Sequence, residues 1–246
     1  MLRSALSFLL IAALAGFALT VDEILDKVEA NENPQTSRAE MTQIVHRADG
    51  RKNVSKLMSY SYDKGDKGLM EYITPARIKG MKILTLNDGD DIWMYSPRTS
   101  RVRKIASHQK KQSVNNSDFS YEDMSMSDTR ADYTCSLEGE DTKDGVACYR
   151  IAAVPKDPDE VLYSKMMLWV DTKKCIGIEV HYFDENGELW KKLFVKDVEK
   201  AGKYWTAKSI EMHNVQKGTK TIMQMDKIEN DIDLDASMFS ERYLRK

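Results

Sequence analysis

The stretch DGDDIWMYSPRTSRVRKI, residues 88–105, contains an acidic turn, an aromatic strand, a corner with a proline and a basic strand. Two strand-length runs joined by a short polar turn are typical of an antiparallel β-hairpin. The same residues place charges beside aromatic rings, a combination that can also contact a phosphate or a lipid headgroup. The hairpin is the simpler interpretation, and it sets the pattern for the rest of the chain.

Strand-length runs continue on both sides of this hairpin, from Met41 onward. Nine short polar turns separate them, namely ADGR, DKGDKG, NDGDD, SPRTS, DTKDG, DTKKC, DENGE, EKAGK and VQKGT. Many of the runs alternate apolar and polar residues with a period of two, as the run from Ile176 to Tyr182 does. The sequence therefore predicts a mainly β protein, built from antiparallel strands with one apolar and one wet face.

Three segments do not fit the strand pattern and predict short helices or flaps. VDEILDKVEANENP, residues 21–34, has an apolar helical face and ends at a proline. In residues 108–133, Ser120 and Asp123 have the spacing of a capping box. In DPDEVLY, residues 157–163, Asp157 and Pro158 occupy positions typical of a helix start. No repeat or linker marks a boundary, so residues 21–246 are expected to form a single domain.

The first 20 residues are typical of a signal peptide. A single charge, Arg3, precedes an apolar run from Ala5 to Leu19 that has small residues near its end. The run is short for a membrane span, although an uncleaved N-terminal anchor is the alternative. We therefore expect export to the periplasm and cleavage after Ala18 or Thr20.

The net charge and the length of the chain limit the classes of function that we expect for the protein. Removal of residues 1–20 lowers Lys+Arg from 37 to 36 against 39 acids, which gives a mature net charge of 36 − 39 = −3. A chain so close to neutrality has no global electrostatic attraction to nucleic acid, so no nucleic-acid partner is expected. A mature length of about 226 residues (246 − 20) is enough for one core or a sizeable cavity.

The chain contains three cysteines. Cys135 and Cys148 flank SLEGEDTKDGVA, which has the pattern of a hairpin that could bring the two thiols together. We expect these two to form a disulfide and Cys175 to stay free, as exported proteins often carry such bonds. The alternative is three buried thiols that act as small apolar residues.

Motifs for catalysis and metal binding are weak. His46, His108, His181 and His213 lie in separate segments, and the sequence has neither a Gly-x-Ser-x-Gly turn nor a His-Glu-x-x-His helix. DIDLDASMFSER, residues 231–242, imitates a calcium loop but lacks the required glycine and the bidentate acid. We therefore predict no catalytic residue, no metal site and no cofactor, and the protein is not expected to be an enzyme.

Two further features of the composition leave alternatives open. The chain has 14 methionines, many of them close to large aromatic residues, which suits either a packed core or a surface that adapts to variable apolar ligands. A basic cluster could contact phosphates, although such residues also protect exposed or edge strands from aggregation. The cluster comprises Arg101, Arg103, Lys104, Lys110 and Lys111.

Residues 79–124 resemble the outer-membrane lipoprotein-sorting proteins of the LolA-like superfamily. The signature consists of an aspartate-rich turn, a Trp-x-Tyr-x-Pro strand, an Arg-Val-Arg-Lys-Ile strand and a Ser-Asp-Phe-x-Tyr-Glu-Asp segment, which here are Asp88 to Asp91, Trp93 to Pro97, Arg101 to Ile105 and Ser117 to Asp123. One departure is SVNNSDF, where such proteins more often have a bulky apolar residue and a glycine before the Ser-Asp pair. A looser resemblance extends over nearly the whole mature chain.

The resemblance implies an incomplete, curved antiparallel β-barrel with short helices covering its open face. It also implies a hydrophobic cavity that accepts the acyl chains of lipoproteins or other lipids for transfer toward the outer membrane. The expected partners are an acylated lipoprotein or lipid and an inner-membrane transporter, and the carrier is expected to be a monomer. The alternatives are a non-catalytic accessory subunit of an inner-membrane lipid exporter and, less favoured, a hydrolase that uses a cleft carboxylate with His108 or His181.

Strand alternation, combined with this resemblance, predicts which residues line the cavity. Residues of one parity on three strands are large and apolar or aromatic, and we expect them to bind lipid. They are Met58, Tyr60, Tyr62, Trp93, Tyr95, Ile178, Val180 and Tyr182.

The processing site can be tested directly. We expect the mature protein purified from the periplasm to begin at Leu19 or Val21, because the small residues before these positions suit a signal peptidase. Intact-mass analysis measures this start. A periplasmic protein that still carries Met1 would contradict the prediction.

Overall fold

The computed structural model describes residues 19–124 and 128–246. The predicted signal peptide lies outside the described residues, except for Leu19 and Thr20. The described part of the chain forms one sheet of thirteen antiparallel strands with a few short helices. The strands are β1 Thr36–His46, β2 Lys52–Tyr62, β3 Lys67–Thr74, β4 Lys82–Leu86, β5 Asp91–Ser96, β6 Arg101–Lys104, β7 Tyr133–Lys143, β8 Val146–Pro155, β9 Lys165–Asp171, β10 Gly177–Phe183, β11 Leu189–Ala201, β12 Tyr204–Asn214 and β13 Thr219–Asn230.

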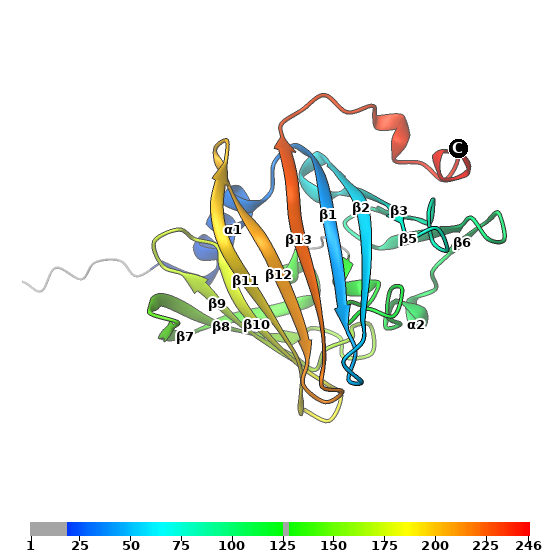
Figure 1. The fold of residues 1–246 in the computed structure, drawn as a ribbon. Coiled ribbons are helices and arrows are strands. Elements are labelled where there is room, and N and C mark those ends of the chain that lie inside the picture. The colour runs from blue at the N-terminus through cyan, green and yellow to red at the C-terminus, as the bar shows by residue number, and fades with distance from the viewer. Residues whose placement is uncertain (1–18, 125–127) are drawn as a thin grey trace, which may run out of the picture.

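The helices are short, and most lie between strands. They are α1 Val21–Glu32, α2 Ser107–Lys110, α3 Thr129–Asp132 and the 3₁₀ turns η1 Asp63–Gly65, η2 Glu122–Met124, η3 Ala236–Met238 and η4 Tyr243–Arg245. Figure 1 shows that the sheet is strongly curved and that some of these short helices lie inside the curve. This architecture confirms the predicted mainly β, incomplete antiparallel barrel, because the sheet is not closed.

The strand order shows how the chain builds the sheet. It runs β6-β5-β4-β3-β2-β1-β13-β12-β11-β10-β9-β8-β7, so the chain starts in the middle and reaches one edge at β6. It then passes to the opposite edge at β7 and returns strand by strand until β13 pairs with β1. The chain passes from edge to edge between β6 and β7, and we call the described residues of this passage, 105–124 and 128–132, the crossing segment.

The largest apolar core lies on the concave face of the sheet. Strand residues of one parity, such as Leu57, Tyr72 and Met212, are almost completely buried there against the crossing segment. Successive residues of a strand point to opposite faces of the sheet, so every second side chain faces this core. This explains why the sequence alternates between apolar and polar residues.

Helix α1 has the bounds that the sequence predicts. Its start is a capping box, in which the Thr20 hydroxyl accepts from the Glu23 amide and the Glu23 carboxylate accepts from the Thr20 amide. Ile24 and Leu25 pack on Ile151 of β8 and Val170 of β9. The helix is therefore held mainly by burial of its apolar face on the sheet.

Of the two alternatives for residues 157–163, a short helix or a flap, the structure has an irregular segment between β8 and β9 and no helix. The Asp157 carboxylate accepts from the Asp159 amide at 3.0 Å and so forms a turn in place of a helix cap. Val161, Leu162 and Tyr163 are buried against Tyr133 and neighbouring side chains. Burial of all three consecutive residues suits an irregular segment better than a helix, which would turn one of them toward solvent.

The C-terminal residues 231–246 cover part of the convex face. Phe239 and Leu244 are buried against Leu69 and Leu84, on the side opposite the crossing segment. In Figure 1 this segment, in red, extends across β3 to β6. The sheet thus carries a second, smaller apolar cluster on its outer side.

The predicted disulfide between Cys135 and Cys148 is wrong, because all three cysteines are free. Cys148 lies opposite Asp141, and Cys135 lies six residues further along β7 (141 − 135), opposite Ala153. Six residues of strand span about 20 Å at roughly 3.3 Å each, whereas a disulfide requires Cα atoms about 4.4–6.8 Å apart.

We therefore expect three thiols to react with an alkylating reagent after unfolding without reductant. Mass spectrometry counts the labels, and prior treatment with reductant is the matched control that should not change the count. A count of one without reductant and three with it would show that the register of β7 and β8 is different.

Candidate functional site on the concave face

The crossing segment is the element that shapes the concave face. Its apolar side chains Val114, Phe119 and Tyr121 are buried among strand residues of the main core. The Val114 amide donates to the Phe119 carbonyl at 2.8 Å, which folds residues 114–119 into a compact loop. The signature segment Ser117 to Asp123 therefore forms a plug that fills the middle of the concave face.

The departure from the family signature has a backbone explanation. Asn115 and Asn116 both adopt left-handed conformations, with φ of 50° and 58°. Asparagine tolerates this region better than most residues with a side chain, and glycine tolerates it best. The loop thus has a tight left-handed turn at the positions where related proteins more often include a glycine.

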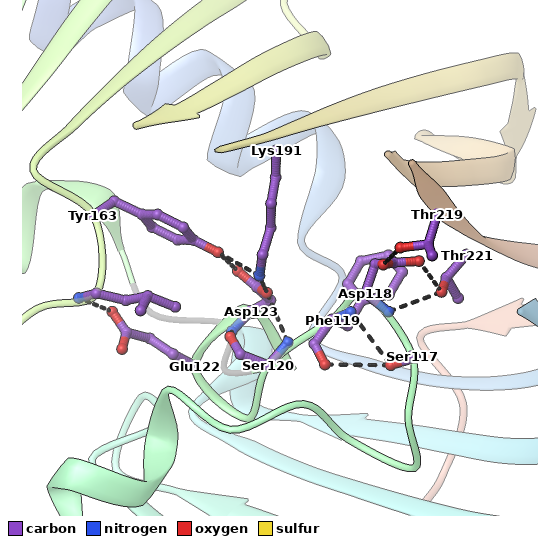
Figure 2. Close-up of polar contacts among 11 residues, drawn as sticks. Ser117, Asp118, Phe119, Ser120, Glu122, Asp123, Tyr163, Lys191, Thr219 and Thr221 are labelled. Carbon is purple, nitrogen blue, oxygen red and sulfur yellow. Dashed lines mark hydrogen bonds and ion pairs between the residues drawn. The ribbon is translucent and has the colours of Figure 1, made fainter. Parts of the chain in front are cut away.

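A buried ion pair fixes the C-terminal end of the plug (Figure 2). The Lys191 ammonium of β11 donates to the Asp123 carboxylate at 2.9 Å, and the two side chains are only 4% and 3% exposed. The Tyr163 hydroxyl donates to the other Asp123 oxygen at 2.5 Å and accepts from Lys191 at 3.0 Å. Burial is the main cause that raises the pKa of Tyr163 well above its ordinary value, so this hydroxyl stays protonated.

The capping box predicted at Ser120 and Asp123 is confirmed. The Ser120 amide donates to Asp123 at 2.7 Å, and the Asp123 amide donates to the Ser120 hydroxyl at 3.1 Å. The Asp123 carboxylate thus accepts hydrogen bonds from the Ser120 amide, from Tyr163 and from Lys191. These three donors compensate the cost of burying its charge. The adjacent Glu122 accepts from the Leu162 amide at 3.0 Å. Together these contacts attach the plug to the segment before β9 and to β11.

Asp118 fixes the other end of the plug. Its two carboxylate oxygens accept from the hydroxyls of Thr219 and Thr221 on β13, at 2.5 Å and 2.8 Å. Its own amide donates to the Thr221 hydroxyl at 2.9 Å. Two buried carboxylates of the signature segment therefore connect the plug to two different strands, as Figure 2 shows.

An apolar cavity of about 310 Å³ lies on the concave face at the end of the sheet where α1 ends. Ala39, Ser59, Ile210 and Met225 contribute to its wall, and Trp205 lies at the same cavity. The volume is near the lower end of the roughly 300–1,000 Å³ typical of ligand pockets. At about 30 Å³ per group of the size of water, the cavity accommodates roughly ten such groups.

The structure does not bring the eight predicted lipid-binding residues together. Val180 and Tyr182 lie on the concave face and pack into its core. Ile178 lines a separate cavity of about 230 Å³ near the β7–β8 turn. The prediction that the eight share one face is therefore wrong, while the binding of lipid by any of them stays a prediction.

The other five lie on the convex face or point toward it. Tyr60 is opposite Leu69, Leu69 opposite Leu84, and Leu84 opposite Trp93, so these side chains share one face. Tyr60, Tyr62, Trp93 and Tyr95 pack with the C-terminal segment, and Met58 has the same parity on β2 as Tyr60. Sequence parity separates two faces of a strand but does not show which face is concave.

The residues of the apolar cavity were not predicted. On β2 the small residues Ser59 and Ser61 line it, and the large aromatic residue between them, Tyr60, faces the other way. Small side chains at one parity of a strand leave the space for a cavity, which is a usable sequence signal. Large size alone was therefore the wrong criterion on this strand.

The described part of the chain has no assembled metal site. Within it, no group of three or more His, Cys, Asp and Glu residues could hold a metal ion. His181 and His213 each contact the carboxylate two residues earlier on the same strand, Glu179 and Glu211. Of the helices in the described ranges, none is both long and apolar enough to span a membrane.

Solved structures with the same fold include two of more than 25% identity. One is a domain described as an outer membrane lipoprotein-sorting protein from Vibrio parahaemolyticus, with a TM-score of 0.85, 26% identity, and 91% of this chain and 97% of that chain covered. Another is a DUF1329 family protein from Desulfovibrio piger, with a TM-score of 0.84, 28% identity, and 90% and 96% covered.

A third comparison extends the fold relationship further. A LolA superfamily protein from Nitrosomonas europaea has a TM-score of 0.76 at 19% identity, with 92% of this chain and 100% of that chain covered. A family model described as "Uncharacterized protein" matches residues 64–246. The search of curated proteins found no match. The predicted resemblance to the LolA-like superfamily is confirmed by these structures.

The buried ion pair provides a test of the plug. Replacing Lys191→Met leaves the Asp123 carboxylate buried without its cation, which should lower the free energy of unfolding by about 3–5 kcal/mol. Denaturant titration measures the loss. Lys192→Met, the next residue on the opposite face of β11, is the matched control and should change stability by less than about 1 kcal/mol. Equal effects of the two changes would show that the pair does not hold the plug.

Proposed function

We propose that this chain, which belongs to the family whose model is described as "Uncharacterized protein" and has the LolA-like fold, is a non-catalytic periplasmic carrier of acyl chains. It would bind lipoproteins or other lipids through an apolar cavity and transfer them toward the outer membrane. The observation that carries the proposal is the apolar cavity of about 310 Å³ on the concave face.

Burial provides the driving force for such a carrier. Each methylene group removed from water contributes about 0.8 kcal/mol, so roughly ten of them contribute about 8 kcal/mol. An acyl chain carried through an aqueous compartment therefore needs an enclosed apolar site that removes a comparable number of methylene groups from water. The cavity fits part of one chain, and a diacyl lipid requires it to enlarge.

The structure offers two covers that could move to enlarge the cavity. One is the C-terminal end of α1, where Glu32, Asn33 and Pro34 line the cavity and the Glu32 carboxylate accepts from the Gly177 amide at 2.7 Å. The other is the plug, which does not line the cavity but packs in the same core as the cavity residue Met41, and which the buried pair of Asp123 and Lys191 holds in place. Because breaking that pair is costly, we propose that the end of α1 opens and that the plug stays.

The partners follow from this role. We propose an acylated lipoprotein or lipid as the cargo, and an inner-membrane transporter as the donor. The carrier would act as a monomer, without nucleic acid. The V. parahaemolyticus domain described as an outer membrane lipoprotein-sorting protein supports this choice of cargo, at 26% identity over nearly its whole length.

A fluorescent fatty acid tests the cavity. Ser59→Phe places a ring in the cavity and should weaken binding of the probe about tenfold or more, because the ring occupies the space of the chain. Met58→Phe places the same ring on the opposite face of β2 and serves as the matched control. It should leave the affinity within about twofold, and thermal unfolding of both variants verifies that they are folded.

Tryptophan emission identifies which face holds the probe. Trp205 lies at the cavity and Trp93 lies under the C-terminal segment. Trp205→Phe should remove most of the emission change caused by the probe, and Trp93→Phe should preserve it. The opposite result, together with unchanged binding by Ser59→Phe, would move the lipid site to the convex face and contradict the proposed cavity.

A further inference from the structure

A second, polar cavity of about 270 Å³ lies at the other end of the concave face. Strand β1 connects the two: Ser37, Ala39 and Met41 line the apolar cavity, and Val45 and His46 line the polar one. The plug contributes to the wall of the polar cavity through Ser117, Asp118 and Ser120. The polar cavity is therefore separate from the proposed acyl site, and nothing in the carrier function accounts for it.

Cations from three distant parts of the chain meet at this cavity. Arg47 comes from the β1–β2 turn, Lys111 from the crossing segment and Lys217 from the β12–β13 turn. Within residues 19–124 and 128–246, no carboxylate forms an ion pair with any of the three. The guanidinium of Arg47 faces the side-chain amide of Asn53, which positions it without neutralising its charge.

The remaining charges at the cavity are already compensated. Lys191 lines it but is paired with Asp123, so these two charges cancel. Asp118 is the single acid in the wall, and both of its oxygens accept from threonine hydroxyls. Arg47 and Lys111 interact with Asp49 and Glu122 without forming an ion pair with them. Three cations against one acid in the wall leave an excess of positive charge in a concave site, where the field is focused.

His46 is a further side chain of the cavity wall, whereas its cross-strand neighbours Lys52 and Lys220 do not line the cavity. The pKa of His46 is lowered, first by desolvation and then by the nearby cations Lys52 and Lys220. A neutral imidazole with its own donor and acceptor therefore lines the cavity beside the cations. Ser113 and Asn116 add further polar side chains to the wall.

We propose that this cavity binds a phosphate group, held by Arg47, Lys111 and Lys217. A planar guanidinium binds two phosphate oxygens at once, and the two ammonium groups supply point charges that neutralise the remainder. At about 30 Å³ per group of the size of water, 270 Å³ holds roughly nine groups, enough for a phosphate and part of its alcohol. The phosphate is either that of a soluble ester or that of a phospholipid headgroup.

The convergence distinguishes this site from an ordinary solubilising surface. In the described part of the chain, a minority of the lysines and arginines have an acidic partner within 4 Å, such as Lys104 with Asp91 and Lys208 with Glu199. The distinguishing feature is therefore that three cations from distant segments line one cavity that has a single acid in its wall. At the polar cavity such partners are absent from the described part of the chain, although the chain has more acids than bases. Lys111 was one of five basic residues for which the sequence left phosphate contact open, and the structure separates it from Arg101 and Arg103 on β6.

The test uses inorganic phosphate and glycerol 3-phosphate as soluble probes, measured by calorimetry. The triple variant Arg47→Gln, Lys111→Gln and Lys217→Gln removes the three cations. The matched control, Lys27→Gln, Lys79→Gln and Arg98→Gln, removes three exposed cations elsewhere. We expect both probes to bind the unchanged protein, the triple variant to bind them about tenfold or more weakly, and the control to differ by less than about twofold.

Vesicles distinguish the two sources of the phosphate. Vesicles of phosphatidylcholine with phosphatidylglycerol that bind the unchanged protein, and the triple variant less, assign the site to a headgroup. Binding of glycerol 3-phosphate without vesicle binding assigns it to a soluble ester. Failure of both soluble probes to bind, or equal binding by the triple variant and the control, overturns the proposal. The fatty-acid titration of the Ser59→Phe variant is independent of these results, so the two sites can fail separately.

Discussion

The passage of the chain from one edge of the sheet to the other is the constraint on which the structure depends. After β6 the chain must cross the concave face to reach β7, and it cannot do so without burying polar backbone. The interaction that makes this possible is the buried pair of Asp123 and Lys191, with the Tyr163 hydroxyl bonded to both. It fixes the plug in the main core of this face. The plug lines the polar cavity, and the apolar cavity lies toward the other end of β1.

Asp118 and Asp123, two of the three acids of the segment Ser117 to Asp123, are thus structural. A buried charge that lacks partners costs several kcal/mol, so Asp118 and Asp123 specify one position of the plug relative to β13 and β11. An apolar plug would bury as much surface but could slide along the face. This explains why a segment with acids next to aromatic residues, Ser117 to Asp123, can be buried in a core.

The fold could be predicted from the sequence to a large extent, and the site could not. The turns and the helix that starts at Val21 are local features, and each was predicted correctly. The failures at Cys135 and Cys148 and in the placement of Tyr60 and Trp93 have a common cause. Each depends on register or on which sheet face is concave, and these properties arise only when all strands are assembled.

The pairing of β1 with β13 sets the order in which the protein can fold. Ser37 lies opposite Asn230, a separation of 193 residues (230 − 37), so the centre of the sheet joins the first and last strands of the chain. Contacts this far apart along the chain carry a large loop-closure entropy and slow the folding of β proteins. Both halves of the sheet can form their hairpins early, but their apolar faces stay exposed until the C-terminal strand joins them. The chain is therefore most prone to aggregation just before its last strand pairs, and a chaperone that shields apolar strands would be most effective at that stage.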